Sequence, residues 1–185
     1  SICERLVSLQ GGIIGVHSVQ GHGARFWFQL PLRVAAAKDG LAALEMARSL
    51  ANRTLRILLV DDNAVNLLVA KLMLQKCFPK AEITQASGGA AALTHLRHEH
   101  FDVLLLDMVM PEVDGLDVIR ILRTELPEPV RHMPVLALTA SANPVDRDKC
   151  LAAGMNEVLN KPLDQQQLVD KISAALVSVA QGATS

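Results

Sequence analysis

The chain has 185 residues, which is enough for one ordinary domain, or for one domain together with part of another. Half of the residues are hydrophobic, and 18 Lys and Arg stand against 19 Asp and Glu, so neither a basic surplus suggests nucleic acid nor an acidic block suggests disorder. With one Trp, four Phe and no Tyr, the chain also lacks the aromatic platforms on which single-stranded nucleic acid stacks.

The first 32 residues have the pattern of one helix followed by two strands. Apolar residues recur at helical spacing at Ile2, Leu6 and Leu9, and a Gly-Gly pair ends that pattern. Strand-like runs cover residues 13–19 and 25–30, and the Gly-His-Gly sequence between them is typical of a hairpin connection. One helix and two strands are too few to bury a core of their own.

Residues 33–54 are rich in alanine and differ in composition from both neighbours. Asp39 is a suitable N-cap for a helix that would run through Leu41, Leu44 and Leu50. We interpret this segment as a linker and predict a helix within it.

Residues 55–180 alternate apolar strands with amphipathic helices, and residues 181–185 form a tail. The predicted strands cover residues 55–60, 81–86, 103–106, 135–138 and 157–160. The predicted helices cover residues 63–78, with Leu68 and Leu72 at spacing four, then 88–99, 114–126, 143–154 and 164–179. Strands that read as uninterrupted apolar runs are buried on both faces, and crossovers of this length join parallel strands. The fold class is therefore α/β, a doubly wound five-stranded parallel sheet with helices on both faces.

Polar residues stand where these strands end. The first strand ends in Asp61-Asp62, the third in Asp107, the fourth in Thr139 and the fifth in Lys161. In sheets of this kind, ligands bind outside the carboxyl ends of the strands, so we expect these residues to meet at one edge. Each alone could be a helix cap, a turn residue or a solvated charge. Together they are hard to explain that way, because clustered carboxylates repel one another unless a cation neutralises them.

The cluster predicts a site for phosphoryl transfer. Oxygen ligands in small number suit Mg²⁺ or Mn²⁺, here held by Asp62 and Asp107, with Asp61 acting through water and the backbone carbonyl of Val109 as a further ligand. A carboxylate such as Asp107 can act as the nucleophile and form an acyl phosphate. Lys161 would neutralise phosphoryl charge, and the Thr139 hydroxyl would donate to a phosphoryl oxygen once one is present.

The segment from 55 to 180 resembles the receiver domain of two-component response regulators. The resemblance is carried by Asp61-Asp62-Asn63, by the run Leu105–Pro111 with Asp114-Gly115, by Leu138-Thr139-Ala140 and by Lys161-Pro162-Leu163. It implies a flavodoxin-like strand order of 2-1-3-4-5 and a cis peptide bond before Pro162. It also implies that Asp107 takes its phosphoryl group from a phosphohistidine, on a kinase dimerisation domain or a histidine phosphotransfer protein.

One position departs from the receiver pattern. Family members usually carry Tyr or Phe three residues before the lysine, and that position is Val158 here. The usual coupling, in which an aromatic ring rotates as the threonine moves, therefore lacks its ring. The alternative interpretation is that Val158 simply packs in the core.

The first 32 residues resemble the last part of the ATP-binding domain of sensor histidine kinases. The shared pattern is a helix, a Gly-Gly turn, a strand and a Gly-x-Gly hairpin into a strand that ends Leu30-Pro31. Followed by a linker and a receiver, it implies a hybrid sensor histidine kinase as the parent protein. None of the six histidines has a phospho-acceptor pattern and the nucleotide-binding boxes are missing, so we expect no ATP-dependent kinase activity from this chain.

Cysteine content and hydropathy predict the compartment. Cys3, Cys77 and Cys150 are far apart and lack metal-ligand spacing, so we expect reduced, mostly buried thiols. No apolar run has the length of a membrane span and no signal peptide is visible. We expect a cytoplasmic fragment of a longer protein, without direct membrane contact, that is a monomer or weak dimer; any membrane anchor of the parent lies elsewhere.

Two other functions compete with the phosphorelay receiver. An aspartate-nucleophile phosphatase typically needs a second acid two residues after the nucleophile, where this chain has Val109. Slow loss of the phosphoryl group to water is still expected. An interaction module that has lost phosphorylation is the other alternative, and the complete set of acids, threonine and lysine argues against it.

Overall fold

The computed structural model describes residues 2–9, 11–21, 23–31, 54–141 and 143–182. The chain divides into two compact units, with the boundary between Asp39 and Gly40. The predicted linker helix and residues 183–185 of the predicted tail lie outside the described residues.

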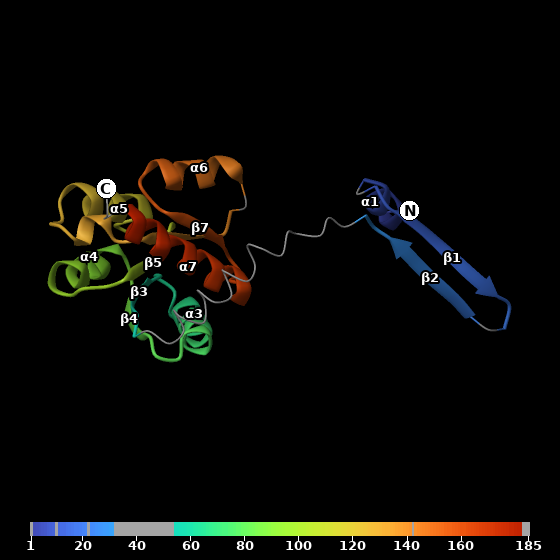
Figure 1. Ribbon diagram of the computed structural model, residues 1–185, viewed down its shortest axis with the longest axis horizontal. Coiled ribbons are helices and arrows are strands. Elements are labelled where there is room, and N and C mark those ends of the chain that lie inside the picture. Colours follow the sequence, from blue (N-terminus) through green and yellow to red (C-terminus); the bar gives the residue numbers. More distant parts are fainter. Residues whose placement is uncertain (1, 10, 22, 32–53, 142, 183–185) are drawn as a thin grey trace. The chain divides into compact units, whose positions relative to one another are not determined.

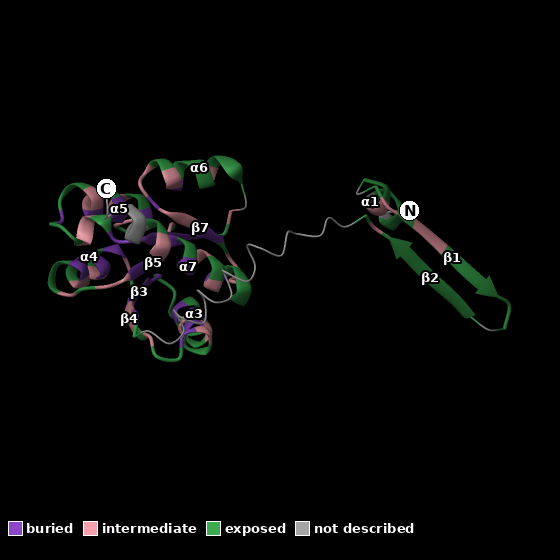
Figure 2. Cartoon of the chain, in the orientation of Figure 1, coloured by how far each residue is buried: buried purple, intermediate pink, exposed green. Residues whose placement is uncertain are grey.

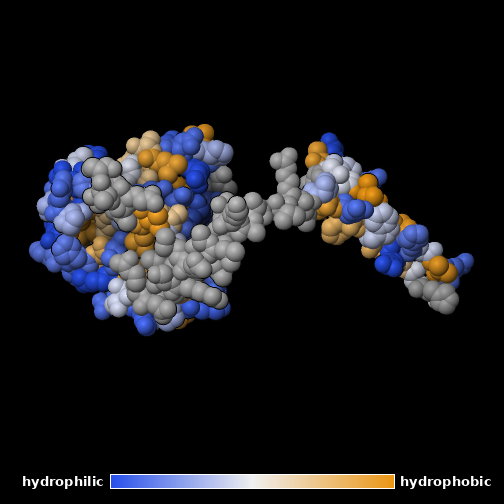
Figure 3. Space-filling view, in the orientation of Figure 1, coloured by the Kyte–Doolittle hydropathy of each residue, from blue (hydrophilic) through white to orange (hydrophobic). Residues whose placement is uncertain are grey.

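The first unit consists of helix α1 (Ile2–Leu9) and the antiparallel strands β1 (Ile13–Val19) and β2 (Gly23–Gln29) (Figure 1). β1 has its predicted bounds, and β2 begins two residues earlier than predicted. None of the described side chains in this unit is buried, and apolar atoms lie along its surface, with Phe26 76% and Phe28 65% exposed (Figure 3). Its described part therefore has no core of its own, as the small number of elements predicts.

The second unit is built on a five-stranded parallel sheet in the order β4-β3-β5-β6-β7 (Figure 1). The strands are β3 (Arg56–Val60), β4 (Glu82–Ala86), β5 (Val103–Asp107), β6 (Val135–Thr139) and β7 (Glu157–Asn160). Counted along the chain, this order is 2-1-3-4-5, so the predicted fold class and strand order are confirmed.

Five α-helices connect or follow these strands, as predicted, with ends that differ by up to three residues. They are α3 (Ala64–Cys77), α4 (Gly89–His98), α5 (Gly115–Thr124), α6 (Pro144–Ala152) and α7 (Gln165–Gly182). A short 3-10 helix η1 (Val130–His132) was not predicted, because a single turn leaves no hydrophobic period in the sequence.

Side chains of the sheet alternate between two hydrophobic layers, one on each face. The strands of the sheet are largely buried (Figure 2). From β3, Leu58 and Val60 face the layer that contains residues of α4, α5 and α6, whereas Ile57 and Leu59 face the layer that contains residues of α3 and α7. All four are fully buried. Burial on both faces explains why the strands read as continuous apolar runs instead of alternating ones.

The buried face of α3 is not the one that carries Leu68 and Leu72, the pair whose spacing predicted the helix. Leu68 and Leu72 are more than half exposed, whereas Leu67, Ala70 and Leu74 face the core. This helix is apolar on nearly all sides, so its periodicity could not select the buried face.

Arg123 of α5 hydrogen-bonds to the segments that precede β6 and β7, at the amino ends of these strands. Its guanidinium donates hydrogen bonds to the carbonyl oxygens of Gly154 and Met133 and to the side-chain oxygen of Asn156. Burial lowers the pKa of this guanidinium. A hollow of about 900 Å³ beside it is lined in part by Arg123 and Asn156, whose polar atoms are thus already engaged within the chain.

The three thiols are free, but only Cys150 is buried; Cys77 is partly exposed and Cys3 is exposed. The prediction of mostly buried thiols was therefore wrong, because Cys3 belongs to the unit without a core. Among the described residues, no helix combines the length and the apolar character needed to span a membrane.

Candidate functional site

The register of the sheet brings the predicted residues to one edge. Val60 of β3 pairs with Leu106 of β5, so that Asp61 and Asp107 follow on neighbouring strands. Asp107 in turn pairs with Leu138, and Thr139 pairs with Asn160, the residue before Lys161. Parallel strands in this register end side by side, which is why residues far apart in the chain meet here.

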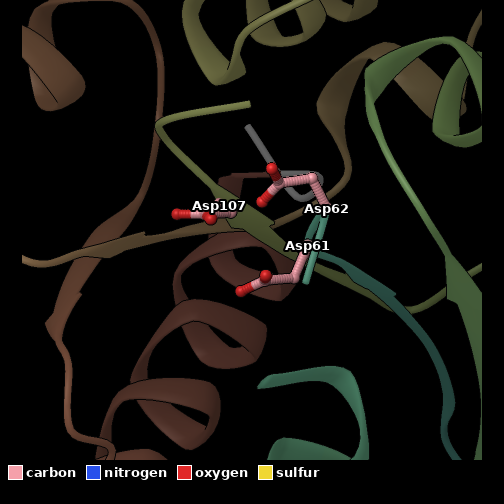
Figure 4. A group of neighbouring side chains, drawn as sticks. All are labelled: Asp61, Asp62 and Asp107. Atoms are coloured by element: carbon pink, nitrogen blue, oxygen red, sulfur yellow. The ribbon is translucent and has the colours of Figure 1, made fainter. Parts of the chain in front are cut away.

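Three carboxylates gather at this edge. Asp61, Asp62 and Asp107 each offer an oxygen, and these atoms all lie within 4.8 Å of one another (Figure 4). Asp61 is 2% and Asp107 is 6% exposed, whereas Asp62 is exposed. The cluster therefore has a buried floor and one acid open to solvent.

Lys161 connects the two buried acids. Its Nζ atom lies 2.6 Å from Oδ2 of Asp61 and 2.9 Å from Oδ2 of Asp107. Its backbone N–H donates to the carbonyl oxygen of Thr139, which ties the ends of β6 and β7 together. The Lys161–Pro162 peptide bond is cis, as the resemblance implied. One ammonium against three carboxylates leaves an excess of negative charge at the site.

The combined effect of burial and neighbouring charges raises the pKa of both Asp107 and Lys161. Burial raises the pKa of Asp107, and the nearby Lys161 ammonium offsets part of this rise. Burial by itself would lower the pKa of Lys161, but its bonds to Asp61 and Asp107 outweigh that effect, and the pKa is raised. Lys161 is therefore a firmly charged cation at neutral pH.

Asp61 is held from several sides. Its Oδ1 accepts hydrogen bonds from the Asn63 backbone N–H at 2.9 Å and from the Asn66 side chain at 3.0 Å, while its Oδ2 faces Lys161. Asn63 also caps α3, because its side chain accepts from the Val65 N–H. The contribution of Asn66 was not predicted, since a surface asparagine in a helix gives no signal until the fold places it beside a strand end.

Thr139 is buried at the end of β6, the strand next to β5. Its Oγ1 accepts a hydrogen bond from the Ser141 backbone N–H at 3.1 Å, a local contact that was not predicted. Ser141 also contacts helix α6 through its own hydroxyl, which donates to Asp146. A Thr-x-Ser-x-Asn-Pro sequence could have indicated such a capping loop.

The loop after β5 packs closely against Asp107. A Cβ at Gly115 would lie 2.6 Å from the Asp107 carbonyl oxygen, so only glycine allows α5 to begin there. Asp114 caps the helix by accepting from the Asp117 N–H at 2.8 Å. Val109 lies in this loop with 78% of its surface exposed, and its backbone N–H hydrogen-bonds to Asp107.

The unusual residue of β7, Val158, is 5% exposed and pairs with Ala137 of β6. It belongs to the hydrophobic layer that also contains Cys150 of α6 and Met155. Val158 is thus a packed core residue and presents no ring to the surface.

Comparison with known proteins identifies the class that this fold and acid cluster define. Residues 57–173 match the response regulator receiver domain, and the chain belongs to this family. Receiver domains are the phospho-accepting modules of two-component signal transduction, and the five-stranded fold of the chain is that of known receivers.

Several relatives are histidine kinases. Sensor histidine kinase AruS of Pseudomonas aeruginosa is 38% identical over 168 residues, which cover 91% of this chain and 16% of that protein. Hybrid signal transduction histidine kinase K of Dictyostelium discoideum is 32% identical over 183 residues, which cover 95% of this chain and 15% of that protein. The chain thus spans less than a fifth of the length of these two relatives.

A solved structure shows the same likeness for the second unit. The receiver domain of sensor histidine kinase PA1611 from Pseudomonas aeruginosa has a TM-score of 0.60 at 34% identity. The match covers 68% of this chain and 99% of that one, and that structure has a magnesium ion coordinated in its active site cleft.

Proposed function

We propose that Asp107 is the phospho-acceptor of a phosphorelay. One of its carboxylate oxygens attacks the phosphorus of a phosphohistidine, the P–N bond breaks, and its electron pair stays on the imidazole nitrogen. The product is an acyl phosphate on Asp107, from which the phosphoryl group passes to another histidine or is lost slowly to water. The observation that carries this proposal is a buried carboxylate with Lys161 at 2.9 Å and two further acids beside it.

Lys161 and Thr139 assist this step. The Lys161 ammonium already contacts Asp107 and can follow charge onto a phosphoryl oxygen without moving far. The Thr139 hydroxyl accepts from Ser141, so its own hydrogen remains for donation to a phosphoryl oxygen. Val109 contributes an apolar side chain two residues after Asp107, where an activating acid for fast hydrolysis would otherwise stand.

The acid cluster suits a magnesium ion, or Mn²⁺. Asp62 and Asp107 would hold it directly, the carbonyl of Val109 would add a ligand, and Asp61 would act through water. An indirect role fits Asp61, because both of its oxygens are already engaged by Lys161 and by amides of the α3 turn. When bound, the ion neutralises charge on the phosphoryl oxygens. The magnesium in the PA1611 receiver supports this assignment.

We further propose the arrangement of the whole chain. Residues 1–32 are the C-terminal piece of a kinase ATP-binding domain, 33–54 a linker, 55–180 the receiver and 181–185 a tail. The similarity to AruS covers 91% of the chain and so extends beyond the receiver, which supports a hybrid histidine kinase as the parent. The chain itself catalyses only its own phosphorylation and dephosphorylation, in the cytoplasm, as a monomer or weak dimer.

The partner that brings the phosphohistidine docks, in this proposal, on α3. This helix exposes an apolar stripe of four side chains that are 52–67% exposed: Val65, Leu68, Val69 and Leu72. Their spacing of three and four residues forms one face, suited to the apolar face of a partner helix. The stripe begins three residues after Asp62, so a helix seated on it lies next to the acid cluster, as phosphoryl transfer from a macromolecule requires.

The test of the phospho-acceptor uses a small donor that needs no docking. With acetyl phosphate and Mg²⁺, we expect the intact mass of the chain to rise by one phosphoryl group. Asp107→Ala should abolish this rise, because no other carboxylate of the cluster stands at the end of β5. Asp117→Ala, which removes an exposed acid of α5, is the matched control and should retain it. Uptake by Asp107→Ala would contradict the assignment, and rapid turnover of unrelated phosphomonoesters would favour a phosphatase.

A further inference from the structure

The loop between β5 and α5 is held at three points. Met110 is 7% exposed and belongs to the hydrophobic layer that contains residues of α4, α5 and α6. The Gly115 N–H donates to the carbonyl oxygen of Met108 at 3.2 Å, which closes the far end of the loop. The third point is Val113, where the loop meets the first turn of α4. Val109, whose carbonyl is the proposed metal ligand, belongs to the segment that these points hold.

The contact between Val113 and α4 depends on a glycine. Gly89, the first residue of α4, is buried, and a Cβ built there would overlap the Val113 carbonyl oxygen and lie 2.8 Å from Val113 Cγ1. Real side chains do not approach so closely, so glycine is needed to leave room for Val113. Leu93 and Leu96 anchor α4 in the core, whereas the loop is exposed at Glu112. A larger residue at position 89 would therefore displace the loop and not the helix.

The turn just before Val113 is strained. Glu112 has a φ of 66°, a left-handed conformation that residues other than glycine rarely adopt. Across this turn, the Val113 N–H donates to the Pro111 carbonyl oxygen at 2.8 Å. Such a conformation costs free energy and persists only where the surrounding structure enforces it. Here Met110 in the core holds one end of the turn, and Val113 against α4 holds the other.

We propose that Gly89 is a positioning residue for the acid cluster. By leaving room for Val113, it fixes the turn at Glu112 and with it the direction of the Val109 carbonyl, three residues before that turn. This inference rests on the proposed function, in which that carbonyl is a ligand of Mg²⁺. The first residue of α4, which follows β4, thus sets the backbone geometry at the end of β5.

Gly89→Ala in the whole chain tests this role, with Mg²⁺ binding followed through the amide NMR signals of residues 107–109. We expect Mg²⁺ to bind about tenfold more weakly, since groups that support a metal ligand have effects of this size. The amide signals of the loop should differ from those of the unsubstituted protein even without Mg²⁺. Phosphorylation by acetyl phosphate should slow at low Mg²⁺ and recover at saturating Mg²⁺, because Asp107 and Lys161 stay in place.

Gly88→Ala is the matched control. Gly88 has a φ of 141°, so alanine is strained there, but nothing lies within 4 Å of a Cβ built at this position. This variant should unfold at a lower urea concentration and keep its Mg²⁺ affinity, which separates lost stability from lost positioning. Unchanged Mg²⁺ affinity in Gly89→Ala, or an equal loss in Gly88→Ala, would overturn the inference.

A second pair of variants tests the turn even if Gly89→Ala does not fold. Glu112→Gly and Glu112→Pro remove the same exposed charge, but glycine accepts a positive φ and proline does not. Glu112→Gly should keep the Mg²⁺ affinity, and Glu112→Pro should weaken it as Gly89→Ala does. Equal affinity in both would contradict the proposed positioning. Absence of any Mg²⁺ response in the unsubstituted protein would instead overturn the proposed metal site, so the two failures are distinguishable.

Discussion

The position of Asp107 in the fold raises the pKa of its carboxyl group. It is the last residue of a strand that is buried on both faces, and its side chain is 9% exposed beside two more acids. Lys161 compensates only in part, so burial still raises the pKa of Asp107. The acidic site therefore lowers the stability of the fold, which fits its proposed role in holding a cation and a phosphoryl group.

We expect the negative charge on Asp107 to lower the stability of the fold at neutral pH. Because its pKa is raised, Asp107 in the folded chain releases its proton at a higher pH than in the unfolded chain, and stability falls as pH rises above the ordinary value of 3.8. We expect Asp107→Asn to unfold at a higher temperature than the unsubstituted protein at pH 7 without divalent metal. The difference should shrink as pH is lowered toward 3.8.

Thermal unfolding followed by circular dichroism measures both effects, with Asp117→Asn as a control for removal of an exposed carboxylate. Mg²⁺ should raise the midpoint of the unsubstituted protein more than that of Asp107→Asn, because ligand binding to the folded state alone stabilises it. An equal rise in both proteins would contradict the assignment of Asp107 as a metal ligand.

At the scale of elements, α3 has one apolar face that packs in the core and a second apolar face that is exposed. Leu67, Ala70 and Leu74 pack in the layer shared with α7, while the stripe from Val65 to Leu72 stays exposed. Four exposed apolar side chains on one helix face are more than scattered surface residues, and such patches mark interaction sites.

A charge placed in the stripe should block docking without affecting chemistry. We expect Leu68→Glu to slow phosphoryl transfer from a histidine-phosphorylated kinase fragment by about tenfold or more, the equivalent of about 1.4 kcal/mol of lost interaction. Uptake from acetyl phosphate should be unchanged, since this donor needs no helix surface. Radiolabel transfer rates measure the first and intact mass the second.

Ala174→Glu, which places the same charge on an exposed position of α7, is the matched control and should transfer normally. Equal slowing in both variants, or slowing with acetyl phosphate too, would argue against a docking surface on α3.

At the scale of the whole molecule, the two units differ in whether their described residues form a hydrophobic core. Both hydrophobic layers of the second unit consist of residues from Leu55 onward. The first unit leaves large side chains such as Phe26 and Phe28 in solvent and has no buried residue among those described. The receiver thus contains its own core, whereas the described part of the first unit leaves its apolar side chains uncovered.

Removal of residues 1–53 should therefore leave the receiver intact. We expect a chain that begins at Thr54 to have the urea midpoint and the phosphoryl uptake of the full chain, because no core or site residue is lost. Urea denaturation and intact mass with acetyl phosphate provide the comparison. A clear fall in the midpoint would show that the first 53 residues stabilise the receiver.

The sequence by itself determined the elements and the chemistry of their ends. Continuous apolar runs and helical periods are local properties, so five βα units, their parallel strands and the acids at the strand ends followed from spacing. The strand order came from the resemblance to receiver domains. The helix caps Asn63 and Asp114 are also local, because a cap acts on the residues that immediately follow it, although neither cap was predicted.

Only the tertiary structure decided which atoms of these groups contact one another. The ion pair between Asp61 and Lys161 spans 100 residues of chain, and the link from Thr139 to α6 depends on how one loop folds back. The buried face of α3 was also decided by packing, since the sequence of a helix that is apolar on nearly all sides does not indicate which side faces the core. Contacts between distant segments depend on the register of the sheet, which the hydrophobic pattern limits but does not specify side chain by side chain.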